Sequence, residues 1–321
     1  MPGPPHLPTG LVFDLDFAQH DPGPGHPESP ERYVALHRAL RQARLLGGGL
    51  LRLPARPARE EDLQLCHTRA YLKTVDQDFS HGARILSTGD TAIAPGSREV
   101  ALLGAGSALA AVDAVMQRKV RNAFAVVRPP GHHATPSRGM GFCIYNNVAI
   151  AARHARKRHG VHRVLIADWD VHHGNGTQET FYRDGSVFFF STHQWPWYPG
   201  TGAADETGEG AGKGATLNVP LPAGAGHAEV VGAFRKKLVP AADGFRPDLV
   251  LISAGFDSRR DDPLGRFRLK DDDFAELTSI ILEIAERHAG GRVVSVLEGG
   301  YNLEGLGLAA VAHLKALRDF R

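Results

Sequence analysis

Cysteine is scarce in this chain, since only Cys66 and Cys143 occur among its 321 residues. Two thiols are too few for a disulfide framework or for a zinc site built from thiolates. An excess of one charge is also missing, because 37 Lys and Arg stand against 35 Asp and Glu, a net charge of +2. The composition therefore gives no reason to expect nucleic acid or a membrane as a partner.

Targeting signals and repeats are equally hard to find. No apolar run reaches the roughly 20 residues of a membrane span, so we expect none. The opening MPGPPHLPTG lacks a basic segment followed by an apolar one, so we expect no signal peptide. No internal repeat, low-complexity segment or linker is visible. We therefore expect one cytoplasmic domain over residues 1–321.

Apolar segments alternate with amphipathic ones along most of the chain. Strands that are apolar throughout and alternate with helices indicate an α/β fold with a parallel sheet covered on both faces. We expect loops at 47–60, 80–95 and 193–214. The expected strands are 11–17, 123–127, 164–170, 187–192, 249–257 and 293–298, and the expected helices are 30–46, 61–75, 98–118, 147–158, 229–239, 271–288 and 306–317.

One stretch, VLIADWDVHHGNG at residues 164–176, ends an apolar strand in two carboxylates and two imidazoles. An ionised carboxylate that leaves water must be paired or bound to a metal. Asp170 and His172 are two residues apart, so an extended backbone points them to the same side. Carboxylate oxygen and imidazole nitrogen together suit zinc. The stretch indicates half of a metal site, with a hydrogen-bonded structural pair as the alternative.

Reactive side chains also follow three other expected strands: His132 and His133, Asp257, and Tyr301. Each one alone has a structural explanation as a cap, turn, loop or packing residue. Ligands of open parallel α/β sheets bind at the carboxyl ends of the strands. Polar groups at four strand ends would therefore meet in one crevice, which favours a catalytic site.

The chemistry of such a site follows from its parts. A zinc held by two carboxylates and one imidazole keeps a position open for water or substrate. The metal polarises a carbonyl and acidifies the water, while a histidine transfers the proton to a leaving amine. A tyrosine hydroxyl stabilises the developing oxyanion. These groups suffice to hydrolyse an amide without a nucleophilic Ser or Cys.

Longer motifs carry a resemblance that runs in order from about residue 10 to 317. With them the chain resembles the zinc-dependent histone deacetylases of the class II type and their bacterial relatives, including acetylpolyamine amidohydrolases. The resemblance implies the arginase–deacetylase fold. The motifs are HDPGPGHPESPER (20–32), RPPGHHA (128–134), GFCIYNNVAIAAR (141–153), DWDVHHGNGTQ (168–178), YPGTG (198–202), SAGFD (253–257) and LEGGY (297–301).

The resemblance also implies the reacting groups. His132 and His133 match the family's tandem histidines, of which the second acts as general base and then general acid, and the first as an electrostatic catalyst. Tyr301 matches the transition-state tyrosine, where feebly active relatives carry histidine. The residues that match the zinc ligands are Asp170, His172 and Asp257.

A substrate tunnel is implied in the same way. Phe142 and Tyr198 match its two aromatic walls, which suit a slender aliphatic chain. Gly141 would offer its backbone carbonyl to the substrate amide nitrogen. Leu264 matches a residue at the tunnel floor or rim, and Asp90 matches a rim aspartate that holds the substrate backbone.

Residues around these groups match the family as well. Asp168 would accept a hydrogen bond from His132, and His173 is expected to point away from the metal. Asn175 stands beside His133 where class I relatives have Asp, and a neutral amide does not favour an imidazolium. We predict that His133 therefore stays available as a base near neutral pH. The family's potassium site is matched by main-chain oxygens of Asp168, Asp170 and His172 with Ser191 and Thr192.

Two substrate classes stay open at this point: an ε-acyl-lysine of a protein or peptide, and an acetylated polyamine or other small amide. Asp205, Glu206 and Glu209 follow Tyr198 and would either attract a cationic chain or form a solvated turn. A binding module without turnover is a third reading, which the complete set of reactive residues argues against. The sequence does not decide whether the chain forms a homo-oligomer.

Overall fold

Eight parallel strands form one sheet in the computed structural model, which describes residues 7–47 and 49–320. The strand order is β2-β1-β3-β8-β7-β4-β5-β6, so the expected parallel α/β sheet is confirmed. We expected no signal peptide in the opening segment MPGPPHLPTG. The first six residues of that segment lie outside the described residues. The strands are β1 (Thr9–Val12), β2 (Leu50–Leu53), β3 (Asn122–Ala125), β4 (Val164–Asp168), β5 (Val187–Gln194), β6 (Thr216–Leu221), β7 (Leu249–Ala254) and β8 (Val293–Leu297).

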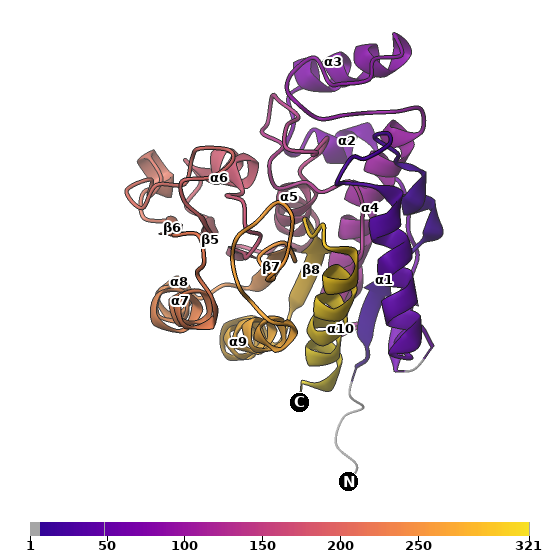
Figure 1. Cartoon of the computed structure of the whole chain (residues 1–321). Coiled ribbons are helices and arrows are strands. Elements are labelled where there is room, and N and C mark those ends of the chain that lie inside the picture. Colours follow the sequence, from indigo (N-terminus) through magenta and orange to yellow (C-terminus); the bar gives the residue numbers. More distant parts are fainter. Residues whose placement is uncertain (1–6, 48, 321) are drawn as a thin grey trace.

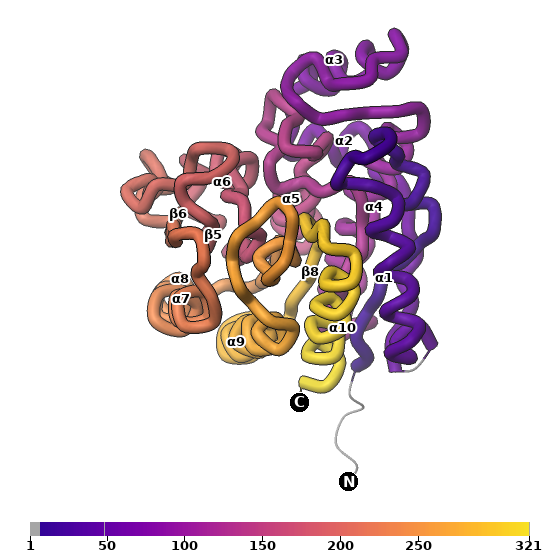
Figure 2. The backbone as a smooth tube through the Cα atoms, viewed as in Figure 1, coloured from indigo at the N-terminus to yellow at the C-terminus, as the bar shows by residue number. Residues whose placement is uncertain are grey.

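Helices cover both faces of this sheet (Figure 1). α4 and α5 pack together against one face, and α9 and α10 pack together against the other. α1 lies beside α10, although the two come from opposite ends of the sequence (Figure 2). The helices are α1 (Pro30–Gln42), α2 (Glu60–Leu63), α3 (Arg69–Ser80), α4 (Ser97–Met116), α5 (Asn147–His159), α6 (Asn175–Phe181), α7 (His227–Ala233), α8 (Val239–Phe245), α9 (Asp271–Ala289) and α10 (Leu303–Asp319).

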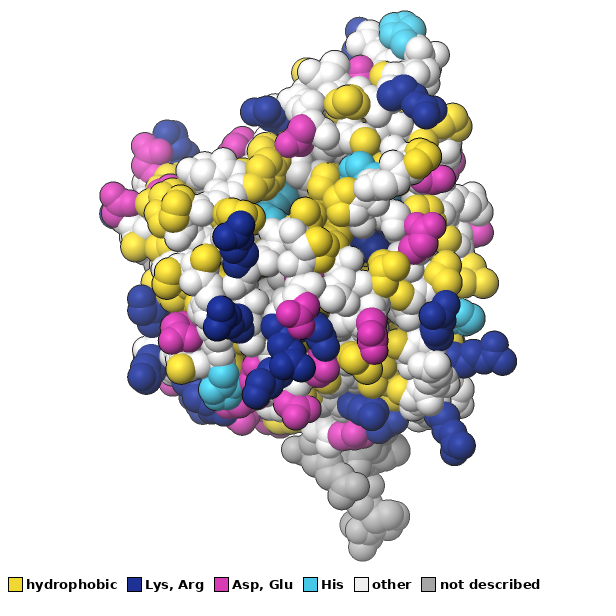
Figure 3. All heavy atoms as spheres, viewed as in Figure 1, with side chains coloured by type: hydrophobic (Ala, Val, Ile, Leu, Met, Phe, Trp, Pro, Cys, Tyr) yellow, Lys and Arg dark blue, Asp and Glu magenta, His cyan; other side chains and the backbone are white. Residues whose placement is uncertain are grey.

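Because helices cover both faces of the sheet, the central strands are almost continuously apolar. Every residue of β4, β7 and β8 is buried, and most of them are Val, Ile, Leu or Ala. By contrast, charged side chains of both signs are interspersed over the lower half of the face shown in Figure 3. That mixture agrees with a net charge close to zero.

α4 is long and apolar enough, by length and composition alone, to cross a membrane, which contradicts the expectation that no run reaches that length. The apolar window of this helix has a mean hydropathy of 1.6, and 67% of it is buried inside the protein. α4 packs against α5 and β3. Its place in the core accounts for its composition.

Several expected elements differ from those in the structure. The first strand ends at Val12 instead of residue 17, because Asp14 accepts a hydrogen bond from the Asp16 amide and caps a 3-10 helix. The helix expected at 61–75 is two helices, α2 and α3, and the Thr68 hydroxyl caps the second. β2 lies within an expected loop, and β6 and α6 were not expected.

Candidate active site

Five neighbouring strands, β3, β8, β7, β4 and β5, end at the same edge of the sheet. Their parallel directions bring the loops that follow them together, as expected for a ligand site in this fold class. Those loops carry the reactive side chains singled out above: His132 and His133 after β3, Tyr301 after β8, Asp257 after β7, Asp170 and His172 after β4, and Tyr198 after β5.

Asp170, His172 and Asp257 form a buried cluster whose potential metal-ligand atoms lie within 4.8 Å of one another. His172 Nδ1 lies 3.0 Å from Asp170 Oδ1 and 3.3 Å from Asp257 Oδ2. The second contact lacks hydrogen-bond geometry, so Asp257 Oδ2 is buried without a hydrogen-bond partner. Such an atom marks a place where the described residues do not satisfy a carboxylate.

The electrostatics of this cluster favour a positive charge. Burial and the neighbouring Asp170 raise the pKa of Asp257 to about 7. Burial opposes the charge on His172, but the neighbouring carboxylates of Asp170 and Asp257 outweigh it and raise the pKa of that imidazole to about 10. Two carboxylates this close repel each other unless a cation lies between them.

His132 and Asp168 are joined behind this cluster. His132 Nδ1 lies 2.9 Å from Asp168 Oδ2, which is the hydrogen bond expected from the sequence. Burial opposes the charge on His132, but the carboxylates of Asp168 and Asp170 outweigh it and raise its pKa well above the ordinary value. His132 is therefore held in its charged form.

His133 has a neutral partner. Its Nδ1 lies 2.8 Å from Oδ1 of Asn175, the first residue of α6. Burial, followed by the charges of His132 and His172, lowers the pKa of His133 well below the ordinary value. The surroundings thus favour the charged imidazolium form of His132 and the neutral form of the adjacent His133.

A cavity of about 340 Å³ leads to these groups. The structure brings all five expected substrate residues to its wall, together with His133, His172 and Tyr301. Two further lining residues, Trp197 and Pro263, were not expected, although the aromatic-rich WPWYPG segment could have suggested Trp197. The complete lining is Asp90, His133, Gly141, Phe142, His172, Trp197, Tyr198, Pro263, Leu264 and Tyr301.

In the cavity wall, the backbone at Gly141 comes very close to the ring of His133. Gly141 has φ +57°, and a Cβ there would lie 2.4 Å from the ring of His133, so a larger residue would displace that ring. The Gly141 amide donates to Asp90 Oδ1 over 2.7 Å, and the Tyr198 hydroxyl donates to Asp90 Oδ2 over 3.0 Å. Asp90 therefore ties the two sides of the mouth together.

Comparison with known proteins agrees with this geometry. A model of the histone deacetylase domain matches residues 26–317. This chain belongs to the histone deacetylase family. It is 44% identical over 299 residues to a histone deacetylase-like amidohydrolase of Pseudomonas aeruginosa, covering 92% of this chain and 78% of that protein.

Two further members of the family are similar to this chain, one in sequence and one in structure as well. The human polyamine deacetylase HDAC10 is 46% identical over 291 residues, covering 87% of this chain and 43% of that protein. The crystal structure of the HDA15 HD domain superposes with a TM-score of 0.92 at 38% identity, covering 98% of this chain and 90% of that one. The deacetylase and amidohydrolase relatives support a hydrolase, and the match confirms the arginase–deacetylase fold.

Three buried charged residues that sequence reasoning missed support this deacetylase-family site. Glu298 accepts hydrogen bonds from the amides of Gly131 and His132, at 2.6 and 3.1 Å. Asp262 Oδ2 accepts from the Tyr301 amide over 2.7 Å. Arg32 donates to the carbonyl oxygens of Glu298 and Gly300, and its guanidinium lies 5.0 Å from the Tyr301 ring centroid. Glu298 ends an apolar strand, a signal of the same kind as Asp168.

His173 is not a member of the Asp170, His172 and Asp257 cluster, in agreement with the expectation that it points away. Its Nδ1 lies 2.8 Å from the Thr201 hydroxyl, and its Nε2 lies 3.0 Å from Gln178 Oε1. Glu206, considered above as part of an acidic rim, instead accepts hydrogen bonds from the Gly202 amide and from Gln178 Nε2. These contacts fix the loop that follows Tyr198.

The remaining acidic and hydroxyl residues are placed as follows. Glu209 pairs with Arg183 at 2.9 Å, and Asp205 is exposed. Ser191 lies beside Asp168 in the sheet, and its hydroxyl is 2.9 Å from His193 Nδ1. The Thr192 hydroxyl is buried without a hydrogen-bond partner.

Proposed function

We propose that this protein is a zinc-dependent deacylase that hydrolyses the amide of ε-acyl-lysine side chains. The proposal rests on three features that lie next to one another: a cavity, a cluster of potential metal ligands, and a histidine–tyrosine pair. A cavity with aromatic walls ends at a buried carboxylate–imidazole cluster, and a histidine and a tyrosine face the same cavity. Residues 1–321 are proposed to form one catalytic domain, located in the cytoplasm.

Zinc fits the residues at the base of the cavity. Two carboxylates and one imidazole are a donor set that zinc accepts, and the unpartnered Asp257 Oδ2 needs a cation. Space for these carboxylates depends on glycine, because a Cβ at Gly299 would lie 2.1 Å from Asp257 Oδ2. Asp170, His172 and Asp257 would hold the ion, which when bound polarises the amide carbonyl and acidifies water.

His133 is proposed as the general base and then the general acid. Its Nδ1–H donates to the Asn175 amide oxygen, which leaves Nε2 as the proton acceptor in the neutral ring. A lowered pKa keeps that nitrogen free to take a proton from water near neutral pH. The same nitrogen then delivers the proton to the departing amine.

His132 and Tyr301 are proposed to stabilise charge without exchanging protons. His132 is kept as an imidazolium by Asp168, so it adds positive charge beside the reacting carbonyl. Burial raises the pKa of Tyr301 well above its ordinary value, so its hydroxyl stays protonated and can donate to the developing oxyanion. Arg32 and Asp262 hold the backbone around this tyrosine.

The cavity favours a neutral aliphatic chain over a polycation. Phe142, Tyr198, Trp197 and Leu264 offer apolar surface to methylene groups, and Asp90 is the single carboxylate in the lining. Both oxygens of Asp90 already accept hydrogen bonds. An acetylated polyamine is the second candidate substrate, supported by the 46% identity to the human polyamine deacetylase.

A panel of substrates tests this choice. Acetyl-, trifluoroacetyl- and longer acyl-lysine peptides are compared with acetylputrescine and acetylspermidine, using zinc-loaded protein and a hydroxamate as inhibitor. We expect a higher kcat/KM for the peptides. A preference for the polyamines would reverse the assignment, and turnover of neither set would leave only binding.

Potassium is proposed as a second, structural ion. The unpartnered, buried Thr192 hydroxyl fits a nearby cation, and the main-chain oxygens of Asp168, Asp170 and His172 are proposed to complete the site with Ser191. No role for nucleic acid or a membrane is proposed. Oligomeric state is to be measured by light scattering.

A further inference from the structure

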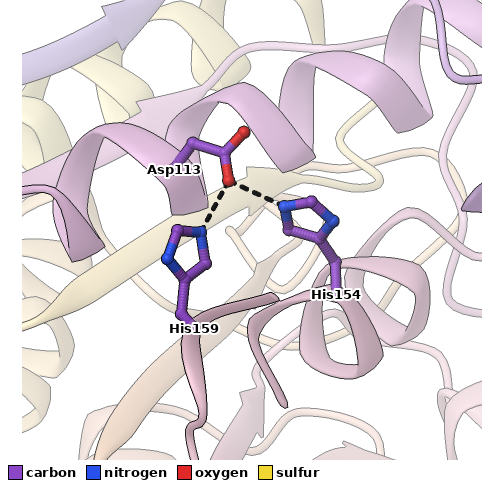
Figure 4. Close-up of side chains that lie close together, drawn as sticks. All are labelled: Asp113, His154 and His159. Atoms are coloured by element: carbon purple, nitrogen blue, oxygen red, sulfur yellow. Dashed lines mark hydrogen bonds and ion pairs between the residues drawn. The ribbon is translucent and has the colours of Figure 1, made fainter. Parts of the chain in front are cut away.

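A second cluster of metal-ligand side chains lies outside the proposed active site. Asp113 of α4 faces His154 and His159 of α5, and their donor atoms lie within 4.8 Å of one another (Figure 4). Both imidazole Nε2 atoms point at the same carboxylate oxygen, Asp113 Oδ1, each over 2.7 Å. None of these residues borders the cavity described above.

The carboxylate of Asp113 divides its two oxygens between different partners. Oδ2 lies 3.1 Å from Nη2 of Arg56, whereas Oδ1 is left to the two imidazoles. A carboxylate that ligates through one oxygen is typically oriented by a hydrogen bond to the other. Arg56 provides that orientation here.

The surroundings allow an ion to enter and to keep water ligands. A cavity of about 300 Å³ adjoins the cluster, and the side chain of Asp113 is 28% exposed while that of His154 is 7% exposed. Donor atoms 2.7 Å apart are hydrogen-bonded to each other, whereas ligands of one tetrahedral zinc are about 3.4 Å apart. Asp113 and His159, the two more exposed members, have room to make this adjustment.

We propose that Asp113, His154 and His159 form a second binding site for a first-row transition ion such as Zn²⁺. Two imidazole nitrogens and one carboxylate oxygen select such ions over Ca²⁺ or Mg²⁺, which prefer oxygen ligands. The ion takes the place of the two Nε2 protons that now face Oδ1, and each imidazole then carries its single proton on Nδ1, any second proton passing to water. Water from the adjoining cavity completes its coordination and leaves the site far less enclosed than the proposed catalytic one.

The test counts bound zinc in the full-length protein. Chelator-treated protein is titrated with Zn²⁺ by calorimetry, and bound zinc per chain is measured after gel filtration. We expect two ions per chain for the unchanged protein and one for His159→Gln, with the activity of the zinc-loaded enzyme preserved in the variant. His159 is chosen because it is less buried than His154 and its replacement is less disruptive to folding.

A matched control is His288→Gln. His288 Nε2 also lies 2.7 Å from an aspartate, Asp243, but there Arg287 replaces the second imidazole. This variant should still bind two ions. A zinc count that is the same in His159→Gln as in the unchanged protein would refute the second site.

Asp170→Asn separates this proposal from the proposed function. If both proposals hold, Asp170→Asn binds one ion per chain, and Asp170→Asn combined with His159→Gln binds none. If His159→Gln removes one ion while Asp170→Asn removes none, the second site stands and the catalytic zinc assignment fails.

Discussion

His133 Nδ1 lies 2.8 Å from Oδ1 of Asn175, a neutral amide, whereas the adjacent His132 has the carboxylate of Asp168 as its partner. The pKa of His133 is lowered, first by burial, and that of His132 is raised by its carboxylate neighbours. Burial beside a neutral partner favours a proposed base at His133, whereas carboxylate neighbours favour a proposed fixed charge at His132.

Asn175→Asp should move the pH–rate profile. A carboxylate in place of the amide favours the imidazolium of His133 and raises its pKa. Since the base must be unprotonated, the acidic limb of kcat/KM should shift upward, by about 1 pH unit. Asn175→Ala is the control, because it removes the oxygen without adding charge and should not shift the limb upward. An unmoved limb in Asn175→Asp would contradict the assigned role.

Tyr301→Phe tests the proposed oxyanion donor. The ring would keep its contacts with Phe142 and Arg32, so the melting temperature should hardly change. Loss of one oxyanion donor typically lowers kcat by about 10²- to 10³-fold. Steady-state kinetics would show this loss, with Tyr182→Phe, in a tyrosine outside the cavity lining, as the control. Unchanged turnover would show that the Tyr301 hydroxyl is not the oxyanion donor.

Zinc removal should make stability depend on pH. The pKa of Asp257 is raised to about 7 and that of Glu298 to about 7, mainly by burial. Groups with a raised folded-state pKa contribute stability that is present below their ordinary pKa and is lost as pH rises through the raised value. Compared with that of Asp257→Asn, the melting temperature of chelator-treated protein should therefore fall between about pH 5 and about pH 8.

Added zinc should counter this loss, because it stabilises the ionised form of Asp257. The rise in melting temperature on zinc addition should grow over the same pH range. Asp257→Asn serves as the comparison, since it removes the titrating ligand and should show a small, nearly constant rise. A rise in the unchanged protein that shrinks with increasing pH would rule out Asp257 as a ligand.

The candidate site could be predicted because the signal for each of its residues lies in the neighbouring residues of the sequence. A carboxylate or imidazole directly after an apolar strand is visible in the letters, and parallel strands bring such positions together. That reasoning brought Asp170, His172 and Asp257 to one crevice, and the family resemblance implied that these three hold zinc. It failed for the two edge strands, β2 and β6, because Arg52 in β2 and Thr216, Asn218 and Pro220 in β6 interrupt the apolar pattern.

Other parts of the site had no local signal. Arg32 lies 268 residues before Gly300, whose carbonyl it binds, and neither the helix start nor the motif at 20–32 assigned it to the site. Asp262 lies in a loop, and its role appears only once the Tyr301 amide is seen to donate to it. Contacts of this kind depend on the packing of α1 and of loops between strands, which no spacing in the sequence records.

His173→Ala should destabilise the protein and weaken substrate binding. The buried ring joins the Thr201 hydroxyl to Gln178, so its removal takes this partner from the Thr201 hydroxyl, leaves Gln178 Oε1 with Asn218 Nδ2 alone and opens a cavity. Losses of this type cost roughly 2–4 kcal/mol in the free energy of unfolding. Because Thr201 follows Tyr198 in the same loop, KM should rise more than kcat falls. Denaturant unfolding and steady-state kinetics measure the two effects, and the exposed His162, changed to Ala, is the control. A stability equal to that of His162→Ala would show that this network does not hold the wall of the cavity.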